Sequence, residues 1–254
     1  MELSRANRAL LRSLYTRHGR KKSGCCVVEG PRAVSELIAA APGSIRFLIH
    51  TGDVPPGVDA PCIPVTESEF HELSGTIHGQ GILAVAQSPA FVPAGEPADD
   101  PYLFALDRVA DPGNFGTICR TARAAGLREL WITEGTADPY GDKALRSGLG
   151  SQFAMRIRFF SDLNALRQAA DAIGYGPVWL TDPHTGTSLY AEPDLYRRSV
   201  VVIGSEGGGV ADLAQAPRVT IPMPGNFESL NAAQAATIFL FESVRRRETP
   251  AISQ

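Results

Sequence analysis

Three polar clusters in the second half of the chain each follow a stretch that is predicted to be a buried strand. The first cluster, residues 107–116 (DRVADPGNFG), contains Asn114 and opens a predicted helix that carries Arg120. An arginine at this place suits a phosphate, because its guanidinium donates two parallel hydrogen bonds and stays charged. The structural alternative is that Asn114 caps the helix and that Arg120 is an ordinary surface side chain.

The second cluster, residues 204–209 (GSEGGG), is a glycine-rich turn with one acid, Glu206. Glycines allow a ligand to approach the backbone closely, and a carboxylate in such a turn is typical of a site for a cation or a hydroxyl. The turn matches neither the dinucleotide fingerprint nor the phosphate-binding loop, which requires a lysine. The third cluster, residues 221–231, ends in Ser229 and Asn231, and either residue could simply cap the helix that follows.

The elements that must position these clusters alternate between strand and helix patterns. Strands are predicted at 102–106, 129–132, 155–159, 178–180, 199–203 and 218–223, and helices at 114–125, 142–149, 162–173 and after 231. This alternation predicts a mostly parallel sheet with helices on both faces. Because such sheets bind ligands at the carboxyl ends of their strands, we expect the clusters to meet at one edge.

The first half of the chain predicts a smaller α/β unit that follows one helix at residues 2–16. Its strands are predicted at 25–29, 45–50, 62–65 and 82–87, and its helices at 31–41 and 66–73. Thr66 and Glu69 have the spacing of a capping box. The proline-rich stretch 88–101 is the clearest linker, so the sequence predicts two domains, residues 1–95 and 96–254.

Composition describes an ordinary globular chain, with 44% hydrophobic residues and a net charge of −3. It has no run of about 18 apolar residues, the first 22 residues lack the apolar segment of a secretory signal, and the four cysteines lack metal-ligand spacing. We therefore expect a cytoplasmic protein without a metal site or membrane span. Residues 1–22 hold seven Lys or Arg against one acid, which suits either phosphate binding or a solvated helix face.

Taken together, the three clusters resemble the three motifs of the SpoU (TrmH-type) RNA ribose 2′-O-methyltransferases of the SPOUT superfamily. DRVADPGNFGTICRTARAAG resembles motif one, VVIGSEGGGV motif two and IPMPGNFESLNAAQAATIFLFE motif three, in the family's order over residues 101–245. The first domain is similar to the substrate-binding domain, of the ribosomal-protein-L30e type, that many rRNA-directed members carry.

The resemblance implies an enzyme that uses S-adenosylmethionine to methylate a ribose 2′-hydroxyl, in large-subunit (23S) rRNA. It implies an α/β-knot domain (a deep trefoil knot) and a homodimer. The family's active residues correspond to Asn114, Arg120, Glu206, Ser229 and Asn231. Its cofactor-binding positions correspond to Leu180, Gly204, Ile221, Met223 and Leu230. In the family, Arg120 would be the base, but a guanidinium is very hard to deprotonate, and a phosphate clamp is the alternative.

Two other functions are compatible with the motifs: a tRNA ribose methyltransferase, and a non-catalytic RNA-binding or ribosome-assembly factor. A dinucleotide-binding oxidoreductase would need a phosphate fingerprint that the chain lacks. The chain departs from the family pattern at Gly148, where a serine is usual. This departure leaves open any substrate contact that the serine would make.

Overall fold

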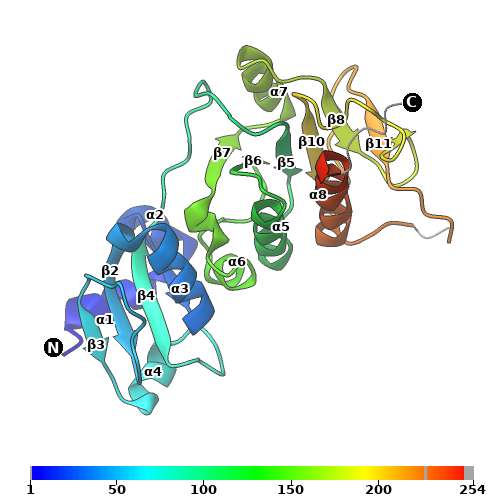
Figure 1. Ribbon diagram of the computed structural model, residues 1–254. Coiled ribbons are helices and arrows are strands. Elements are labelled where there is room, and N and C mark those ends of the chain that lie inside the picture. The colour runs from blue at the N-terminus through cyan, green and yellow to red at the C-terminus, as the bar shows by residue number, and fades with distance from the viewer. Residues whose placement is uncertain (1, 226–227, 249–254) are drawn as a thin grey trace. The chain divides into compact units, whose positions relative to one another are not determined.

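The computed structural model describes residues 2–225 and 228–248 and divides into two compact units (Figure 1). The first unit takes the residues up to 90 together with 138–154, and the second takes 91–137 and those from 155 onward. Residues 138–154 group with the first unit because they pack on it: Asp138 accepts two hydrogen bonds from Arg20, at 2.9 and 2.7 Å. None of the described helices is both long and apolar enough to cross a membrane.

The first unit is built on a four-stranded sheet in the order β1-β4-β2-β3. Strand β4 (Ile82–Gln87) runs antiparallel to β1 (Cys25–Glu29) and β2 (Ile45–His50), and β3 (Cys62–Pro64) runs parallel to β2. The helical elements are α1 (Arg5–Leu14), α2 (Arg17–Ser23), α3 (Pro31–Ala40), η1 (Pro42–Ser44), α4 (Glu67–Leu73), α6 (Asp142–Ser147) and η2 (Ser151–Ala154).

The helix predicted at residues 2–16 corresponds to α1, and a second helix, α2, follows it where none was predicted. The side chain of Thr16 accepts a hydrogen bond from the backbone N–H of Gly19 and so caps a new helix. Leu11 and Leu14 of α1 are buried in the core with Phe47 of β2. The predicted cap of α4 is confirmed, since Thr66 Oγ1 accepts a 3.2 Å hydrogen bond from the Glu69 N–H.

The second unit is built on a seven-stranded sheet in the order β7-β6-β5-β10-β8-β11-β9, in which every neighbouring pair is parallel. Its strands are β5 (Leu103–Asp107), β6 (Glu129–Thr133), β7 (Arg156–Phe160), β8 (Val178–Thr181), β9 (Thr187–Ser188), β10 (Val200–Gly204) and β11 (Arg218–Thr220). Its helices are α5 (Pro112–Ala124), α7 (Leu163–Ala172) and α8 (Ala232–Glu248), with α5 and α8 packed side by side (Figure 1).

The stretch predicted as a linker is packed on the second unit from residue 92 onward. The Val92 N–H donates to the Ile157 carbonyl, and the fully buried Arg158 guanidinium donates to three linker carbonyls, those of Pro93, Ala94 and Glu96. Glu129 neutralises this arginine at 2.7 Å. Composition alone indicated a loose segment. It could not show this packing, because the arginine that binds these carbonyls lies about 60 residues further along the chain.

The centre of the second sheet positions the three polar clusters. The run Val200–Ile203 of β10 is buried on both faces, as expected for a central parallel strand. In the register of β10 with β5, Gly204 lies opposite Asp107. The first and second clusters therefore leave the sheet at the same edge.

Candidate active site

One residue from each polar cluster meets in a hydrogen-bonded group. The Nδ2 groups of Asn114 and Asn231 each donate to Oε1 of Glu206, both at 2.5 Å, and Asn231 Nδ2 also lies 3.2 Å from Asn114 Oδ1. These residues stand 92 and 25 positions apart from Glu206 in the chain. The sheet edge thus brings together three side chains that the sequence singled out separately; we call them the amide–carboxylate cluster.

Asn114 is not the cap of its helix. Asp111 is the N-cap of α5, and its Oδ1 accepts a 2.8 Å hydrogen bond from the Asn114 backbone N–H. Pro112 occupies the first helical turn, where its missing N–H costs nothing. The side chain of Asn114 is therefore left for Glu206, and the simple capping alternative does not account for it.

Asn231 serves both as a cap and as a member of the cluster. Its Oδ1 accepts from the backbone N–H groups of Ala233, at 2.9 Å, and Gln234, at 3.4 Å, which begin α8. Its Nδ2 group faces Glu206. Capping fixes the amide orientation, because an oxygen bound to the helix end turns the nitrogen toward the carboxylate.

Glu206 lies on a tight, closed loop. Ser205 and Gly209 exchange two backbone hydrogen bonds, at 3.1 and 2.9 Å, which close the loop around Glu206. Gly204 lies so close to the returning chain that a Cβ there would be 2.1 Å from the Gly209 carbonyl carbon. Beyond the loop, the Ala211 N–H donates to a carboxylate oxygen of Asp107 at 2.8 Å. Both ends of the loop are therefore fixed to the sheet.

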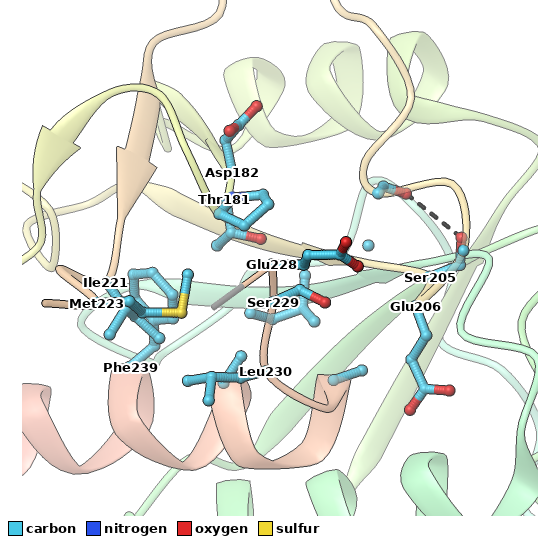
Figure 2. A pocket seen from close by; sticks show the side chains of 17 residues that line it. Thr181, Asp182, Ser205, Glu206, Ile221, Met223, Glu228, Ser229, Leu230 and Phe239 are labelled. Carbon is cyan, nitrogen blue, oxygen red and sulfur yellow. Dashed lines mark hydrogen bonds between the residues drawn. The ribbon is translucent and has the colours of Figure 1, made fainter. Parts of the chain in front are cut away.

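A cavity of about 290 Å³ opens beside this loop (Figure 2). Figure 2 shows Ile221, Met223 and Phe239 at one side of the cavity and Ser205 and Glu206 at the other. Four of the five expected cofactor positions line it: Gly204, Ile221, Met223 and Leu230. The fifth, Leu180, does not, because its side chain is buried in the sheet core at 1% exposure. The next two residues, Thr181 and Asp182, line the cavity instead.

The described cavity lining is acidic. It includes the carboxylates of Asp182, Glu206 and Glu228 and no lysine, arginine or histidine. Burial opposes the charged form of Asp182, but the N–H groups of His184 and Thr185, together with the Arg218 guanidinium, outweigh it and lower the pKa of this carboxyl. A cavity with this charge favours a cationic ligand and disfavours a phosphate.

The remaining two expected active residues lie around the cluster without joining it. Ser229 lines the cavity and is exposed. Arg120 is exposed on α5, six residues beyond Asn114, or about 9 Å along a helix axis. Its side chain makes no hydrogen bond or ion pair with any described residue, so it is free to take an external partner.

Asp107 belongs to the first polar cluster that the sequence singled out, whereas Asp182, which lines the cavity, was not predicted as a site residue. Asp107 is a buried acid that ends the apolar strand β5, where Thr133 Oγ1 donates to it at 2.7 Å. Asp182 follows the end of β8, so the strand-end rule that selected the other clusters applies to it equally. Asp182 could therefore have been found from its position just after the strand predicted at 178–180.

The departure at Gly148 has a structural explanation within the first unit. A Cβ at Gly148 would lie 2.6 Å from Oε1 of Gln152, so the glutamine side chain takes the space that a serine would need. Gln152 is fully buried, and its Nε2 donates to the carbonyls of Ala144 and Pro139. The packed side chain of Gln152, four residues later, thus explains why glycine and not serine stands at position 148.

Comparison with known proteins identifies relatives of both units. Residues 101–241 match the model of the SpoU rRNA Methylase family, and residues 10–84 match that of the MRM3-like substrate binding domain. The chain is 31% identical to the 23S rRNA (guanosine(2553)-2′-O)-methyltransferase RlmP of Bacillus subtilis, over 91% of this chain and 92% of that protein. It is 27% identical to human mitochondrial rRNA methyltransferase 3, over 89% of this chain and 69% of that protein.

Solved structures match over nearly the whole chain. The SpoU methyltransferase AviRb from Streptomyces viridochromogenes, in complex with the cofactor AdoMet, superimposes with a TM-score of 0.82 at 29% identity, covering 96% of this chain and 98% of that one. An AdoMet-bound rRNA methyltransferase from Sinorhizobium meliloti gives 0.82 at 26% identity, with 97% of each chain covered. These neighbours confirm the predicted fold class, an α/β-knot domain with a mostly parallel sheet and a smaller N-terminal α/β domain.

Proposed function

Because the chain belongs to the SpoU rRNA methylase family, we propose that it transfers a methyl group from S-adenosylmethionine to a ribose 2′-hydroxyl of large-subunit (23S) rRNA. The observation that carries the proposal is the amide–carboxylate cluster beside an acidic cavity. The named relatives act on rRNA, and two of the solved neighbours hold AdoMet, which makes rRNA and this cofactor the first choices for the chain.

The residues of the cavity fit S-adenosylmethionine. Ile221, Met223 and Phe239 offer an apolar side to the adenine, and the closed loop at Gly204 offers backbone groups. The carboxylates on the lining favour the positive sulfonium and ammonium groups. When bound, this cofactor would supply the methyl group from its sulfonium.

The amide–carboxylate cluster would orient the acceptor hydroxyl. A ribose hydroxyl is a weak nucleophile, so the rate depends on its orientation and on where its proton points. The two asparagine amides hold Oε1 of Glu206, and among the described residues nothing donates to its Oε2. We assign this second oxygen to accept the hydrogen bond of the 2′-hydroxyl and finally its proton, which would leave an oxygen lone pair turned toward the methyl group.

Arg120 would hold an RNA phosphate rather than act as a base. Its side chain is exposed and has no ionic partner among the described residues, whereas a base would need to lose a proton that a guanidinium keeps. The fork of the guanidinium matches two phosphate oxygens. A phosphate held about two helical turns from Asn114 would fix the neighbouring ribose over the cluster.

The homodimer and the cytoplasmic location belong to the same proposal. The second unit exposes large apolar side chains, Phe241 of α8 at 47% and Tyr190 at 56%, which a second copy could cover. All four cysteines are free thiols, as is usual in a reducing compartment.

The test is methyl transfer from radiolabelled S-adenosylmethionine to protein-free 23S rRNA, with purified tRNA as the competing substrate. We expect label in 23S rRNA, at a position that resists alkaline cleavage because a 2′-O-methyl group blocks the attack of the ribose oxygen on its phosphate. Label in tRNA alone would show that tRNA, and not 23S rRNA, is the substrate. Label at a nucleotide that alkali still cleaves would contradict methylation of the ribose.

Calorimetric titration with S-adenosylmethionine separates the enzyme from a non-catalytic RNA-binding factor. We expect saturable binding by the wild-type protein and its loss in Leu230→Trp, whose larger side chain fills the cavity. Leu230→Met is the matched control, because it keeps an apolar side chain of similar volume. Absence of wild-type binding at millimolar cofactor would favour the RNA-binding factor.

A further inference from the structure

Helix α1 carries an arginine stripe opposite its buried face. Arg5, Arg8 and Arg12 recur at i, i+3 and i+7, a spacing that places them on one side of a helix. The opposite side is anchored by Leu11 and Leu14, which are 0% and 1% exposed in the core of the first unit. The burial of these leucines therefore fixes the stripe toward solvent.

Helix α2 continues the positive charge, and it packs against α1. It contributes Arg17, Lys21 and Lys22, all of them exposed. Together with Arg5 and Arg12 of α1 they form five exposed cations, which we call the N-terminal basic surface. No described residue makes a hydrogen bond or an ion pair with any of these five side chains.

The two other arginines of this segment have structural partners. Arg8 pairs with Glu69 of α4, and Arg20 donates to Asp138 Oδ2 at 2.7 Å and to the Leu14 carbonyl at 2.8 Å. Arg8 and Arg20 are thus held by partners within the protein, whereas the five cations of the basic surface have no such partner among the described residues. The solvated-face interpretation would need five unpaired like charges in one segment, which repel one another without compensation.

The rest of the chain is strongly acidic. With seven Lys or Arg and one acid removed from the totals of 24 and 27, the remainder holds 17 against 26. An RNA backbone is repelled by that remainder, so a polyanion must be attracted by a local concentration of cations. A membrane surface fits less well, since α1 buries its leucines and leaves no exposed apolar face to insert.

We propose that the N-terminal basic surface of α1 and α2 binds the phosphate backbone of the RNA substrate. The inference rests on the proposed function for the identity of the RNA. Phosphate contacts of this kind fix position and supply affinity without reading sequence. Target selection would then depend on other surfaces, and the basic surface would set the strength and salt dependence of binding.

The experiment measures the affinity of the full chain for a 23S rRNA fragment across a salt series. The test variant is Arg5→Gln/Arg12→Gln, which removes charge while keeping good helix formers. The control for total charge is Arg167→Gln/Arg197→Gln, which removes two arginines that have partners within the second unit. A second variant, Arg5→Lys/Arg12→Lys, keeps the charge and should retain most of the affinity.

We expect the slope of log K against log salt to become shallower by about 1.5 in the glutamine variant, from about 0.7–0.9 for each lost phosphate contact. If the two proteins bind equally at 1 M salt, a slope difference of about 1.5 corresponds to about 30-fold weaker binding of the glutamine variant at 0.1 M salt. The control variant should change the slope by less than about 0.5. The glutamine variant should lose affinity for an unrelated RNA fragment to the same extent as for the 23S rRNA fragment, because phosphate contacts do not read sequence.

Unchanged slope and affinity in the glutamine variant would overturn the inference, and loss in the control as well would show an effect of total charge only. Cofactor titration distinguishes this outcome from failure of the proposed function, since cofactor binding does not involve the basic surface. RNA binding that depends on Arg5 and Arg12, in a protein that transfers no methyl group, would keep this inference and refute the proposed activity.

Discussion

The closed loop at Gly204 makes a quantitative prediction about the cofactor site. A Cβ added at Gly204 would lie 2.1 Å from the carbonyl carbon of Gly209 and 2.2 Å from the Val210 nitrogen. Ordinary contact begins at 3.4 Å, so in Gly204→Ala the returning chain must retreat by about 1.3 Å. All the atoms in its way are backbone, which cannot rotate aside as a side chain would.

The expected effect follows from the cost of such overpacking. Forcing a methyl group into a packed site costs about 1–3 kcal/mol, and the chain can reduce this cost by displacing the loop. A ligand that needs the native loop must then restore it, which corresponds to about 5- to 150-fold weaker binding. Glu206 would move with the loop, so methyl transfer should fall further than cofactor affinity.

The assay is calorimetric titration of S-adenosylmethionine into wild type, Gly204→Ala and Gly207→Ala. Gly207 is the matched control on the same loop: its Cβ would meet nothing within 4 Å, and its φ lies outside the left-handed region. A Gly204→Ala protein that melts cooperatively and binds the cofactor within twofold of wild type would refute the reasoning. Equal losses in both variants would contradict the steric explanation.

Three further outcomes test other parts of the site. Arg120→Ala should lower methyl transfer at least about 100-fold with cofactor affinity nearly unchanged, and near wild-type transfer would refute the assigned phosphate clamp. Asp107→Asn should lower the free energy of unfolding, measured in urea, by about 1–3 kcal/mol, because the Ala211 N–H loses a charged acceptor. Thr133→Val removes only the hydroxyl that donates to Asp107, so a smaller loss in Asp107→Asn than in Thr133→Val would contradict this reason. The hydrogen bond from Arg245, together with Arg246, lowers the pKa of Glu242, so its carboxylate stabilises the fold fully above its ordinary value of 4.5 and progressively less as the pH falls toward the lowered pKa. Glu242→Gln should therefore lower the melting temperature at pH 7, and the difference from wild type should shrink progressively below pH 4.5. A difference of unchanged size in acid would refute this origin.

Much of the second unit follows from local pattern. Alternation of apolar strands with helices predicted a parallel sheet, and the strand predicted at 199–203 is the doubly buried β10 at its centre. Strand ends also predicted where polar groups would gather. These inferences succeed because periodicity and strand direction are properties of short segments, which the sequence displays directly.

Other features of the fold depend on distant partners. The stretch 92–100 has the composition of a linker, but partners far along the chain fix it to the second unit, among them the buried guanidinium of Arg158 and the Tyr175 hydroxyl. Helix α2 was not predicted, and the chain forms it directly after α1, where Thr16 offers a cap. A local pattern does not record which of two adequate conformations tertiary packing will favour.

The candidate site shows the same division. The types and spacing of Asn114, Glu206 and Asn231 singled out each residue, but left helix capping as an alternative to chemistry for the two asparagines. The fold decided between them: Asp111 took the cap of α5, while Asn231 caps α8 with its oxygen and presents its nitrogen to Glu206. A hydrogen bond between residues 92 positions apart depends on angles that only the packed sheet determines, and for that reason tertiary structure decided how the polar residues of this chain form one cluster.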